Sequence, residues 1–141
     1  MKNTYSPNFK LSEFACKCGC GKCIVHPILI ERLQRIATHF DSPVFINSGY
    51  RCSSHDVAVG GNGLGAHTMG IAADIRVANV SAMEVAKFAQ SIGCGGIGII
   101  TDKDIHIDIR DLSGYDIAGF VYTNNHWYGN EQTGETYTTF I

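Results

Sequence analysis

Residues 104–109, DIHIDI, alternate strictly between an acidic or imidazole side chain and an isoleucine. Successive side chains of a β-strand point to opposite faces of the sheet. If the three isoleucines face a hydrophobic core, the opposite face presents an acid, an imidazole and an acid. That polar row consists of Asp104, His106 and Asp108. The chain must then build a sheet that is covered on one face and carries polar groups on the other.

The other periodic segments complete an α+β pattern. Residues 26–40 place apolar side chains at helical spacing, with Pro27 at the first helical position, which suits it. A second helix begins at Ser81, whose side chain can form a capping box with Glu84. The strand-like segments are 44–46, 71–77, 96–100 and 105–111, with a turn at 101–104 between the last two. We therefore predict an α+β fold with a mostly antiparallel sheet and flanking helices.

The length of 141 residues fits one domain, because domains most often contain roughly 100–150 residues. No internal repeat, low-complexity segment or linker interrupts the chain, so we predict a single domain over residues 1–141. The segment 111–141 is rich in Tyr, Gly, Asn and Thr. It is expected to form a short hairpin or an irregular segment that covers the core.

Charge and hydropathy exclude several classes of function. The net charge is −2 and no cluster of Lys or Arg is present, which argues against nucleic acid and anionic membranes as partners. No apolar run approaches the ~18 residues that span a bilayer. Residues 1–10 lack the apolar core of a secretory signal, so we expect none in this chain. We also expect a monomer.

Three residues in and before the strand-like segments have the chemistry of a metal site. Asp74 lies within the apolar strand AADIRV, where a lone buried carboxylate would cost several kcal/mol unless it is paired or bound to a metal. His67 precedes it by seven residues, and His106 lies on the strand described above. Imidazole and carboxylate bind Zn²⁺, and three protein ligands plus a water form its catalytic arrangement. The alternative is that the histidines are ordinary polar residues and that Asp74 pairs with Arg76 or Arg110.

Four motifs give the chain a family resemblance. SGYR at 48–51, AVGG at 58–61, HTMGIAAD at 67–74 and GIGII…IHIDIR at 96–110 occur in order. This pattern resembles the zinc D-alanyl-D-alanine peptidases of the peptidase M15 type, whose fold is shared with the amino-terminal domain of hedgehog proteins. The likeness covers a core of residues 8–110. Members mostly cleave peptidoglycan stem peptides, as D,D-carboxypeptidases, dipeptidases or L-Ala-D-Glu endopeptidases of bacteria and phages.

The resemblance implies a role for each matching residue. His67, Asp74 and His106 correspond to the zinc ligands, which leave a fourth position for a water that the metal activates. Arg51 of SGYR corresponds to an arginine beside the reacting carbonyl, where it can stabilise negative charge. A structural salt bridge is the alternative for Arg51.

Two positions depart from the family pattern. Lys103 stands where many members have an acid, three residues before the last zinc histidine, and Gly65 stands where a serine is usual. The general base must therefore be another acid near His106. We expect Asp108, since one branch of the family ends its motif in H-x-D, with Asp104 as the second candidate. Asp108 has an alternative role, which is to orient His106 through a hydrogen bond.

Cysteines form a second notable cluster, ACKCGCGKC at residues 15–23. Cys16, Cys18, Cys20 and Cys23 can be read as ligands of a second, structural Zn²⁺, although four thiolates in eight residues need unusual backbone turns. The rival interpretation is a disulfide from Cys16 or Cys20 to Cys52, or free thiols. The sequence favours disulfide or free thiols over a second metal.

Aromatic residues of the tail offer one more candidate feature. Trp127, with Tyr122 and Tyr128, is expected either to line a substrate groove or to pack the tail onto the core.

The main hypothesis is a zinc metallopeptidase of peptidoglycan stem peptides. We expect it to act at the cell wall, in a phage-derived setting as an endolysin or after release by another route. The alternative is a binding module that keeps zinc on the same fold without catalysis.

Overall fold

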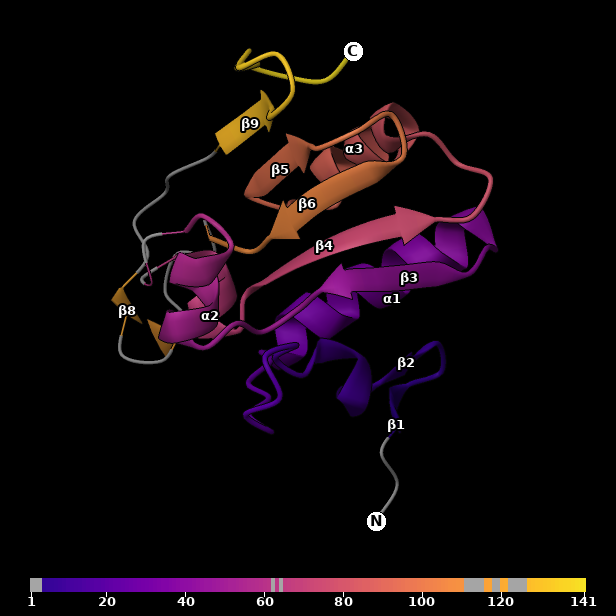
Figure 1. Cartoon of the computed structure of the whole chain (residues 1–141). Helices are drawn as coiled ribbons and strands as arrows, with labels where there is room; N and C mark the ends of the chain where they lie inside the picture. The colour runs from indigo at the N-terminus through magenta and orange to yellow at the C-terminus, as the bar shows by residue number, and fades with distance from the viewer. Residues whose placement is uncertain (1–3, 62, 64, 111–115, 118–119, 122–126) are drawn as a thin grey trace.

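A five-stranded sheet organises the chain (Figure 1). The computed structural model describes residues 4–61, 63, 65–110, 116–117, 120–121 and 127–141. Along the sheet the strands follow the order β3 (Val44–Ser48), β4 (Ala72–Val77), β6 (Asp104–Asp108), β5 (Gly96–Ile99) and β9 (Trp127–Asn130). Every neighbouring pair is antiparallel except β5 and β9, which are parallel. The prediction of a mostly antiparallel α+β fold is confirmed.

Helices cover one face of the sheet. In Figure 1, α1 (Pro27–Phe40) and α3 (Ala82–Ser91) lie behind the sheet, and α2 (Ser53–Ala58) lies beyond one end of β4 and β6. The remaining elements are short. They are β1 (Thr4–Ser6), β2 (Phe9–Lys10), the 3₁₀ turns η1 (Leu11–Phe14) and η2 (Ala66–Met69), and the hairpin strands β7 (Asp116–Ile117) and β8 (Phe120–Val121). No helix among these described residues is long and apolar enough to cross a membrane.

The helix termini have local causes in the sequence. Pro27 occupies the start of α1, and the Nδ1 atom of His26 accepts a hydrogen bond from the backbone N–H of Ile28 at 3.1 Å. Ser81 caps α3, because its hydroxyl accepts the backbone N–H of Glu84 at 3.2 Å. Both helices then turn an apolar stripe toward the sheet. The buried side chains of α1 are Leu29, Ile30, Leu33, Ile36 and Ala37.

The alternation in residues 104–109 places the isoleucines in the core and the polar side chains on the opposite face, as predicted. Ile105, Ile107 and Ile109 are completely buried in the core between the sheet and the helices. The opposite face of β6 aligns with polar residues of β4. The register pairs Arg76 with Asp104, Asp74 with His106 and Ala72 with Asp108. Asp74 and His106 are therefore direct neighbours across two strands.

The carboxy-terminal segment was only partly predicted. The β7–β8 hairpin agrees with the expected hairpin, but β9 instead extends the main sheet as a parallel edge strand. Its sequence WYGN lacks the apolar alternation that indicates a strand. Close packing holds it, because a Cβ atom at Gly98 would lie 2.5 Å from the Trp127 ring. Tyr122 lies outside the described residues.

Gly98→Ala tests this contact between β5 and β9. The added methyl group overlaps the Trp127 ring, so we expect a loss of about 1–3 kcal/mol in unfolding free energy, typical of overpacking. Trp127 is the single tryptophan of the chain, so its emission reports on this site directly and is expected to shift to longer wavelength. Gly65→Ala is the control, because a Cβ there meets nothing within 4 Å. Urea denaturation followed by fluorescence measures both changes, and an unaltered Gly98→Ala variant contradicts the packing.

Candidate metal centre and active site

Three side chains from separate elements converge on the polar side of the sheet. His67 comes from η2, Asp74 from β4 and His106 from β6. One potential ligand atom from each lies within 4.8 Å of the other two. The Oδ1 atom of Asp74 is 3.2 Å from Nε2 of His67 and 3.0 Å from Nδ1 of His106. The predicted triad is therefore brought together in space.

Both imidazoles are fixed by hydrogen bonds on the side that points away from Asp74. Nδ1 of His67 lies 2.8 Å from the carbonyl oxygen of Gly49, which can only accept, so this nitrogen donates. In the same way Nε2 of His106 donates to Oδ2 of Asp108 at 2.7 Å. When the ring is neutral, the nitrogen that faces Asp74 is the one that carries the lone pair and can bind a metal ion. Two imidazole nitrogens and a carboxylate oxygen that converge in this way are joined either by shared protons or by a metal ion.

The distances suit a tetrahedral metal. Bonds of about 2.0–2.1 Å to nitrogen and oxygen place the ligand atoms of Zn²⁺ roughly 3.3 Å apart. The measured separations of 3.2 and 3.0 Å lie close to that value. These residues fit a zinc ion with His67 bound through Nε2, Asp74 through Oδ1 and His106 through Nδ1.

The electrostatics also favour a positive charge among these groups. Burial alone would raise the pKa of Asp74, but hydrogen bonds from His106 and His67 hold it well below the usual range. Burial lowers the pKa of His106, but its bonds to Asp108 and Asp74 raise it to about 9. In the absence of a metal, a proton on His106 supplies the positive charge between the carboxylates. A bound metal would replace that proton, because metal ligation requires the neutral ring.

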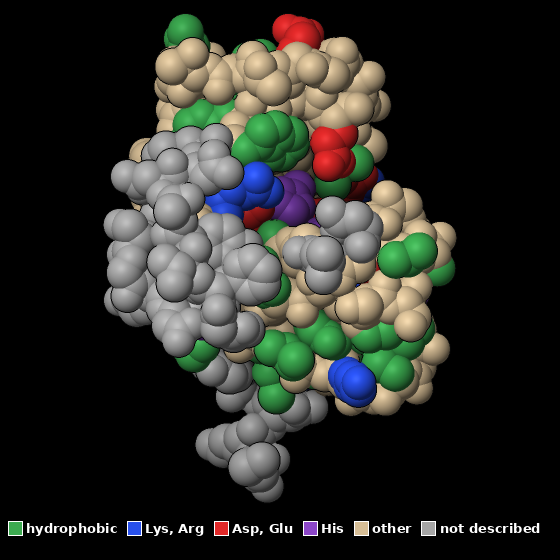
Figure 2. Space-filling model, turned by 90° about the vertical axis from the view of Figure 1, so that its left-hand side faces the viewer, with side chains coloured by type: hydrophobic (Ala, Val, Ile, Leu, Met, Phe, Trp, Pro, Cys, Tyr) green, Lys and Arg blue, Asp and Glu red, His purple; other side chains and the backbone are tan. Residues whose placement is uncertain are grey.

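A pocket of about 340 Å³ opens onto the triad. Figure 2 shows histidine, basic and acidic side chains gathered in a hollow of this face. Besides the three ligand candidates, the described residues that line the pocket are Arg51, Val59, Gly60, Gly61 and Glu131. Substrate access to the triad is therefore open from this side.

Arg51 reaches the pocket as the family resemblance implied. Its Nη2 atom lies 3.2 Å from Oδ2 of Asp74, and its Nη1 atom lies 3.0 Å from Oδ1 of Asp56. Its Nε atom also donates to the hydroxyl of Ser48. The salt bridge that the sequence offered as the alternative is therefore present, and Arg51 also lines the pocket. The salt bridges hold the guanidinium beside the metal site.

Asp56 is a residue of this site that the sequence analysis missed. Its side chain is buried, pairs with Arg51 and accepts the backbone N–H of Gly63 at 3.0 Å. Burial would raise its pKa, but the bonds from Arg51 and Gly63 lower the pKa below the usual range. The sequence held only a weak signal for this role, an acid in the short helix that follows SGYR.

Asp108 and Asp104, the two acids predicted as candidates for the general base, lie outside the lining of this pocket. Asp108 is completely buried behind His106, and the backbone N–H and guanidinium of Arg110 donate to it. Both oxygens of Asp104 bind the guanidinium of Arg76 at 2.8 Å. Neither acid lines the pocket described above. Arg76 and Arg110 thus pair with these acids, and the alternative in which either of them pairs with Asp74 is wrong.

Glu131 is the other missed residue. It is exposed, follows β9 directly and lines the pocket, and its backbone N–H donates to the carbonyl of Ile99 at 2.7 Å. Trp127, at the start of β9, lies with its ring centroid 6.4 Å from that of His106. Tyr128 instead packs on Phe140 in the core. Of the three aromatic residues predicted for a substrate groove, Trp127 lies near the site, Tyr128 does not, and Tyr122 is outside the described residues.

The thiol cluster differs from the predicted one. Cys16, Cys18 and Cys20 gather with Cys52, so that Cys52 replaces Cys23 in the group. The thiol of Cys23 donates to the carbonyl of Leu11 instead. None of the six cysteines, all of which lie in the described part of the chain, forms a disulfide. The path of the loop explains why Cys52 and not Cys23 joins the group. The loop brings Cys16, Cys18 and Cys20 to the start of α2, and Cys23 comes after this stretch.

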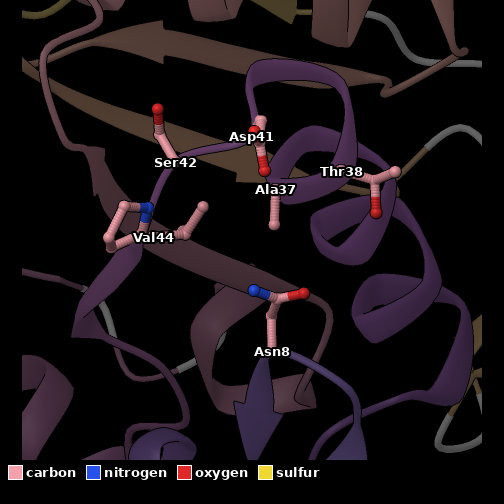
Figure 3. Close-up of a pocket in the computed structure, with 7 residues that line it drawn as sticks. Asn8, Ala37, Thr38, Asp41, Ser42 and Val44 are labelled. Atoms are coloured by element: carbon pink, nitrogen blue, oxygen red, sulfur yellow. The ribbon is translucent and has the colours of Figure 1, made fainter.

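A further hollow of about 450 Å³ lies between the amino-terminal segment, the end of α1 and the start of β3 (Figure 3). Its lining includes Asn8, Thr38, Asp41 and Ser42. The described residues around it include one acid but no histidine, cysteine or basic side chain. This hollow offers no group of residues suited to catalysis.

Comparison with known families supports the resemblance. The family model for peptidase M15 matches residues 7–108, a span that contains SGYR, the triad and Asp108. No curated protein matches the chain.

Asp56→Asn tests how Arg51 is held. Because the pKa of Asp56 is lowered in the folded chain, its contribution to stability is present above the unfolded pKa of about 3.9 and is lost as the pH falls through the folded value. We expect the variant to lose about 2 kcal/mol of unfolding free energy at pH 7, because it leaves Arg51 short of a charged partner. The difference from the wild type is expected to shrink at pH 3.

Urea denaturation at both pH values measures the effect. Asp102→Asn, at an exposed acid of the β5–β6 turn, is the matched control and is expected to change little. An equal loss at pH 7 and pH 3 in Asp56→Asn contradicts the ion pair as its cause.

Proposed function

The chain belongs to the peptidase M15 family, and from this premise we propose that it is a zinc peptidase that hydrolyses peptide bonds in peptidoglycan stem peptides. The family is one of metallopeptidases, and the chain has a candidate metal site for that chemistry. The observation that carries the proposal is the convergence of two imidazole nitrogens and one carboxylate oxygen in the lining of an open pocket.

His67, Asp74 and His106 would hold the zinc ion, which when bound would supply Lewis-acid chemistry by lowering the pKa of water toward ~7 and polarising a carbonyl group. The chain's own residues would supply the rest. Arg51 lies beside this position with its guanidinium held by two carboxylates. Its remaining N–H groups can stabilise the negative charge that develops on the carbonyl oxygen of the scissile bond.

Glu131 is the best-placed proton acceptor. A general base must reach the attacking water, so it must face the pocket. Among the described residues that line this pocket, the acids are Asp74 and Glu131, and Asp74 is a ligand candidate. We propose that Glu131 takes the proton from water and passes it to the leaving amine. It would replace the family acid, whose position is Lys103.

Asp108 has a different proposed role. It is fully buried and bonded to Nε2 of His106, which supports the alternative that it orients this ring. Room for its carboxyl group comes from Gly96, where a Cβ would lie 2.1 Å from Oδ2 of Asp108. By holding the proton on Nε2, Asp108 keeps Nδ1 available for the metal.

The candidate bonds for cleavage come from the resemblance rather than from the pocket. We propose a D,D-carboxypeptidase or L-Ala-D-Glu endopeptidase that acts at the cell wall, in a phage-derived setting or after release by another route. The competing proposal is a binding module that retains zinc without turnover. Lys103 in place of the family acid favours that alternative, and Glu131 argues against it.

Incubation with muropeptides tests the function. We expect the zinc-loaded chain to cleave one stem-peptide bond, which mass spectrometry of the products identifies. His67→Ala removes one ligand, so the zinc content should fall by one ion per chain and cleavage should stop. Thr68→Ala, at the half-buried residue that follows His67 in η2, is the control. Intact muropeptides in the presence of zinc-loaded protein favour the binding module, and unchanged zinc content in His67→Ala contradicts the ligand set.

Glu131→Gln tests the proton acceptor. The amide cannot accept the proton, so kcat is expected to fall by about 10²–10⁴-fold with zinc content unchanged. The acidic limb of the pH profile of kcat/KM should also disappear. Glu135→Gln, at another exposed acid of the same segment, is the control.

The same assay separates Glu131 from the acids near His106. Asp104→Asn is expected to keep kcat, and Asp108→Asn is expected to weaken zinc binding by about 10–100-fold. A Glu131→Gln variant with full kcat, or an Asp108→Asn variant that keeps zinc but loses all turnover, contradicts the assignment.

A further inference from the structure

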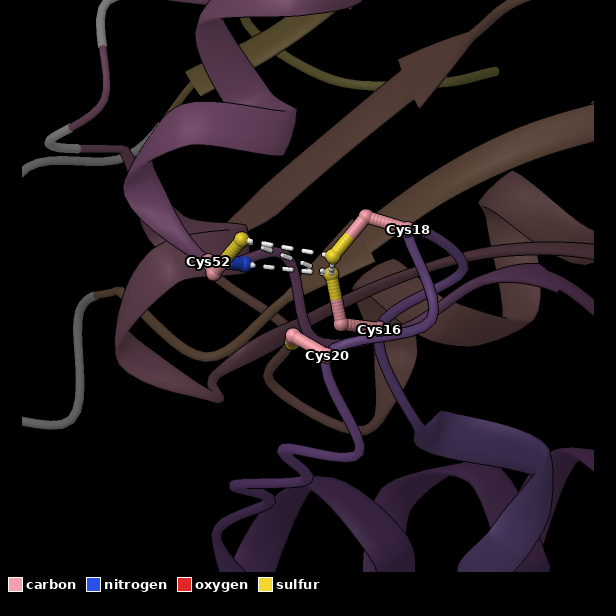
Figure 4. Close-up of side chains that lie close together, drawn as sticks. All are labelled: Cys16, Cys18, Cys20 and Cys52. Carbon is pink, nitrogen blue, oxygen red and sulfur yellow. Dashed lines mark hydrogen bonds between the residues drawn. The ribbon is translucent and has the colours of Figure 1, made fainter.

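Four thiols from two distant segments meet beside the active site (Figure 4). Cys16, Cys18 and Cys20 lie on the loop between η1 and α1, and Cys52 lies at the amino-terminal cap of α2. One sulfur from each lies within 4.8 Å of all the others. We propose that these four cysteines bind a second, structural zinc ion.

The sulfur separations suit this ion. Zn–S bonds of about 2.3 Å place the sulfurs of a tetrahedral site roughly 3.8 Å apart. Cys16 and Cys52 are 3.7 Å apart, Cys18 and Cys52 are 3.6 Å apart, and Cys16 and Cys18 are 3.4 Å apart. A disulfide requires one pair at about 2.05 Å. Three nearly equal distances single out no such pair and match the edges of a metal tetrahedron.

The backbone of the loop allows the closely spaced cysteines to converge. Gly19 and Gly21 have φ values of +86° and +77°, which glycine adopts without strain, so the loop can turn twice within a few residues. The backbone N–H of Cys16 donates to the carbonyl of Lys22 at 2.9 Å and closes this loop. The fourth ligand, Cys52, comes from a second segment, as in structural zinc sites built from two parts of a chain.

One further contact favours a negatively charged sulfur. The backbone N–H of Cys52 points at Sγ of Cys16, with a separation of 3.4 Å. A hydrogen bond of this kind stabilises a thiolate more than a thiol, because the acceptor is ionised. Cys18 and Cys20 are exposed, so a metal ion can reach the group from solvent.

The site would connect the amino-terminal loop to the arginine of the active site. Cys52 directly follows Arg51, and the backbone N–H of Tyr50 already donates to the carbonyl of Phe14 at 2.8 Å. A zinc ion at this point would fix both ends of that contact. It would therefore limit the movement of Arg51 relative to Asp74. This positional effect on catalysis rests on the proposed function, but the metal site itself does not.

Metal stoichiometry of the purified full-length chain under reducing conditions tests the proposal. We expect two zinc ions per wild-type chain. Cys18→Ser/Cys52→Ser should retain one, and His67→Ala should retain the other. Cys23→Ser is the matched control and should retain both, because Cys23 lies outside the group. Loss of an ion in Cys23→Ser, or two ions in Cys18→Ser/Cys52→Ser, overturns the ligand set.

A measurement on the unmutated chain covers the case in which the double variant does not fold. Cobalt(II) loading of the wild type should give thiolate-to-cobalt charge-transfer absorption and the intense visible bands of a tetrahedral site, and His67→Ala should keep them. Intact-mass analysis without reductant should find all six thiols reduced. A cobalt spectrum without thiolate absorption, or a mass lowered by the two hydrogens of a disulfide, overturns the proposal. Either result leaves the muropeptide assay free to decide the proposed function separately.

Discussion

The carboxylate of Asp74 is the charge around which the rest of this structure is arranged. It lies on a central strand of the sheet, where it would destabilise the fold if left alone. His67, His106 and Arg51 each direct a nitrogen toward it, within 3.2 Å. Each of these partners is held by another group, namely the carbonyl of Gly49, Asp108 and Asp56. The buried polar network of the site thus follows from one acid in an apolar strand.

The sequence predicted the parts of the fold and site that depend on short-range periodicity. Alternation at 104–109 places the isoleucines in the core and His106 on the other face, and this holds because side-chain direction in a strand depends only on residue parity. The helical stripe of α1 and the cap at Ser81 follow in the same way. The ligand candidates could be named because the motif HTMGIAAD and the later histidine occur in the order of a known family.

The remaining site residues depend on how the loops and the sheet edge are placed, which periodicity does not specify. Glu131 reaches the pocket only because β9 joins the edge of the sheet, and WYGN carries no pattern that indicates this pairing. Asp56 pairs with Arg51, five residues earlier, through the turn from SGYR into α2, and the backbone N–H of Gly63 also donates to its carboxylate. Cys52 replaces Cys23 because the loop after η1 folds toward α2. Spacing along the chain does not fix any of these three contacts, although the proximity of Cys16 or Cys20 to Cys52 was one of the alternatives that the sequence offered.

The four consecutive residues 49–52 contact the metal site, the amino-terminal segment and the thiol group. The carbonyl of Gly49 fixes the ring of His67, the N–H of Tyr50 binds the amino-terminal segment, Arg51 binds Asp74, and Cys52 enters the thiol group. A displacement of this segment would therefore alter the orientation of a metal ligand and the position of the arginine together. The segment needs anchoring on both sides, because it leaves β3 as an irregular stretch without ladder hydrogen bonds of its own. Asp56 supplies an anchor on the side of α2, and the thiol group supplies one on the side of the amino-terminal loop. With the proposed zinc ion bound, the cysteines would contribute rigidity at this point rather than further ligands for the metal of the active site.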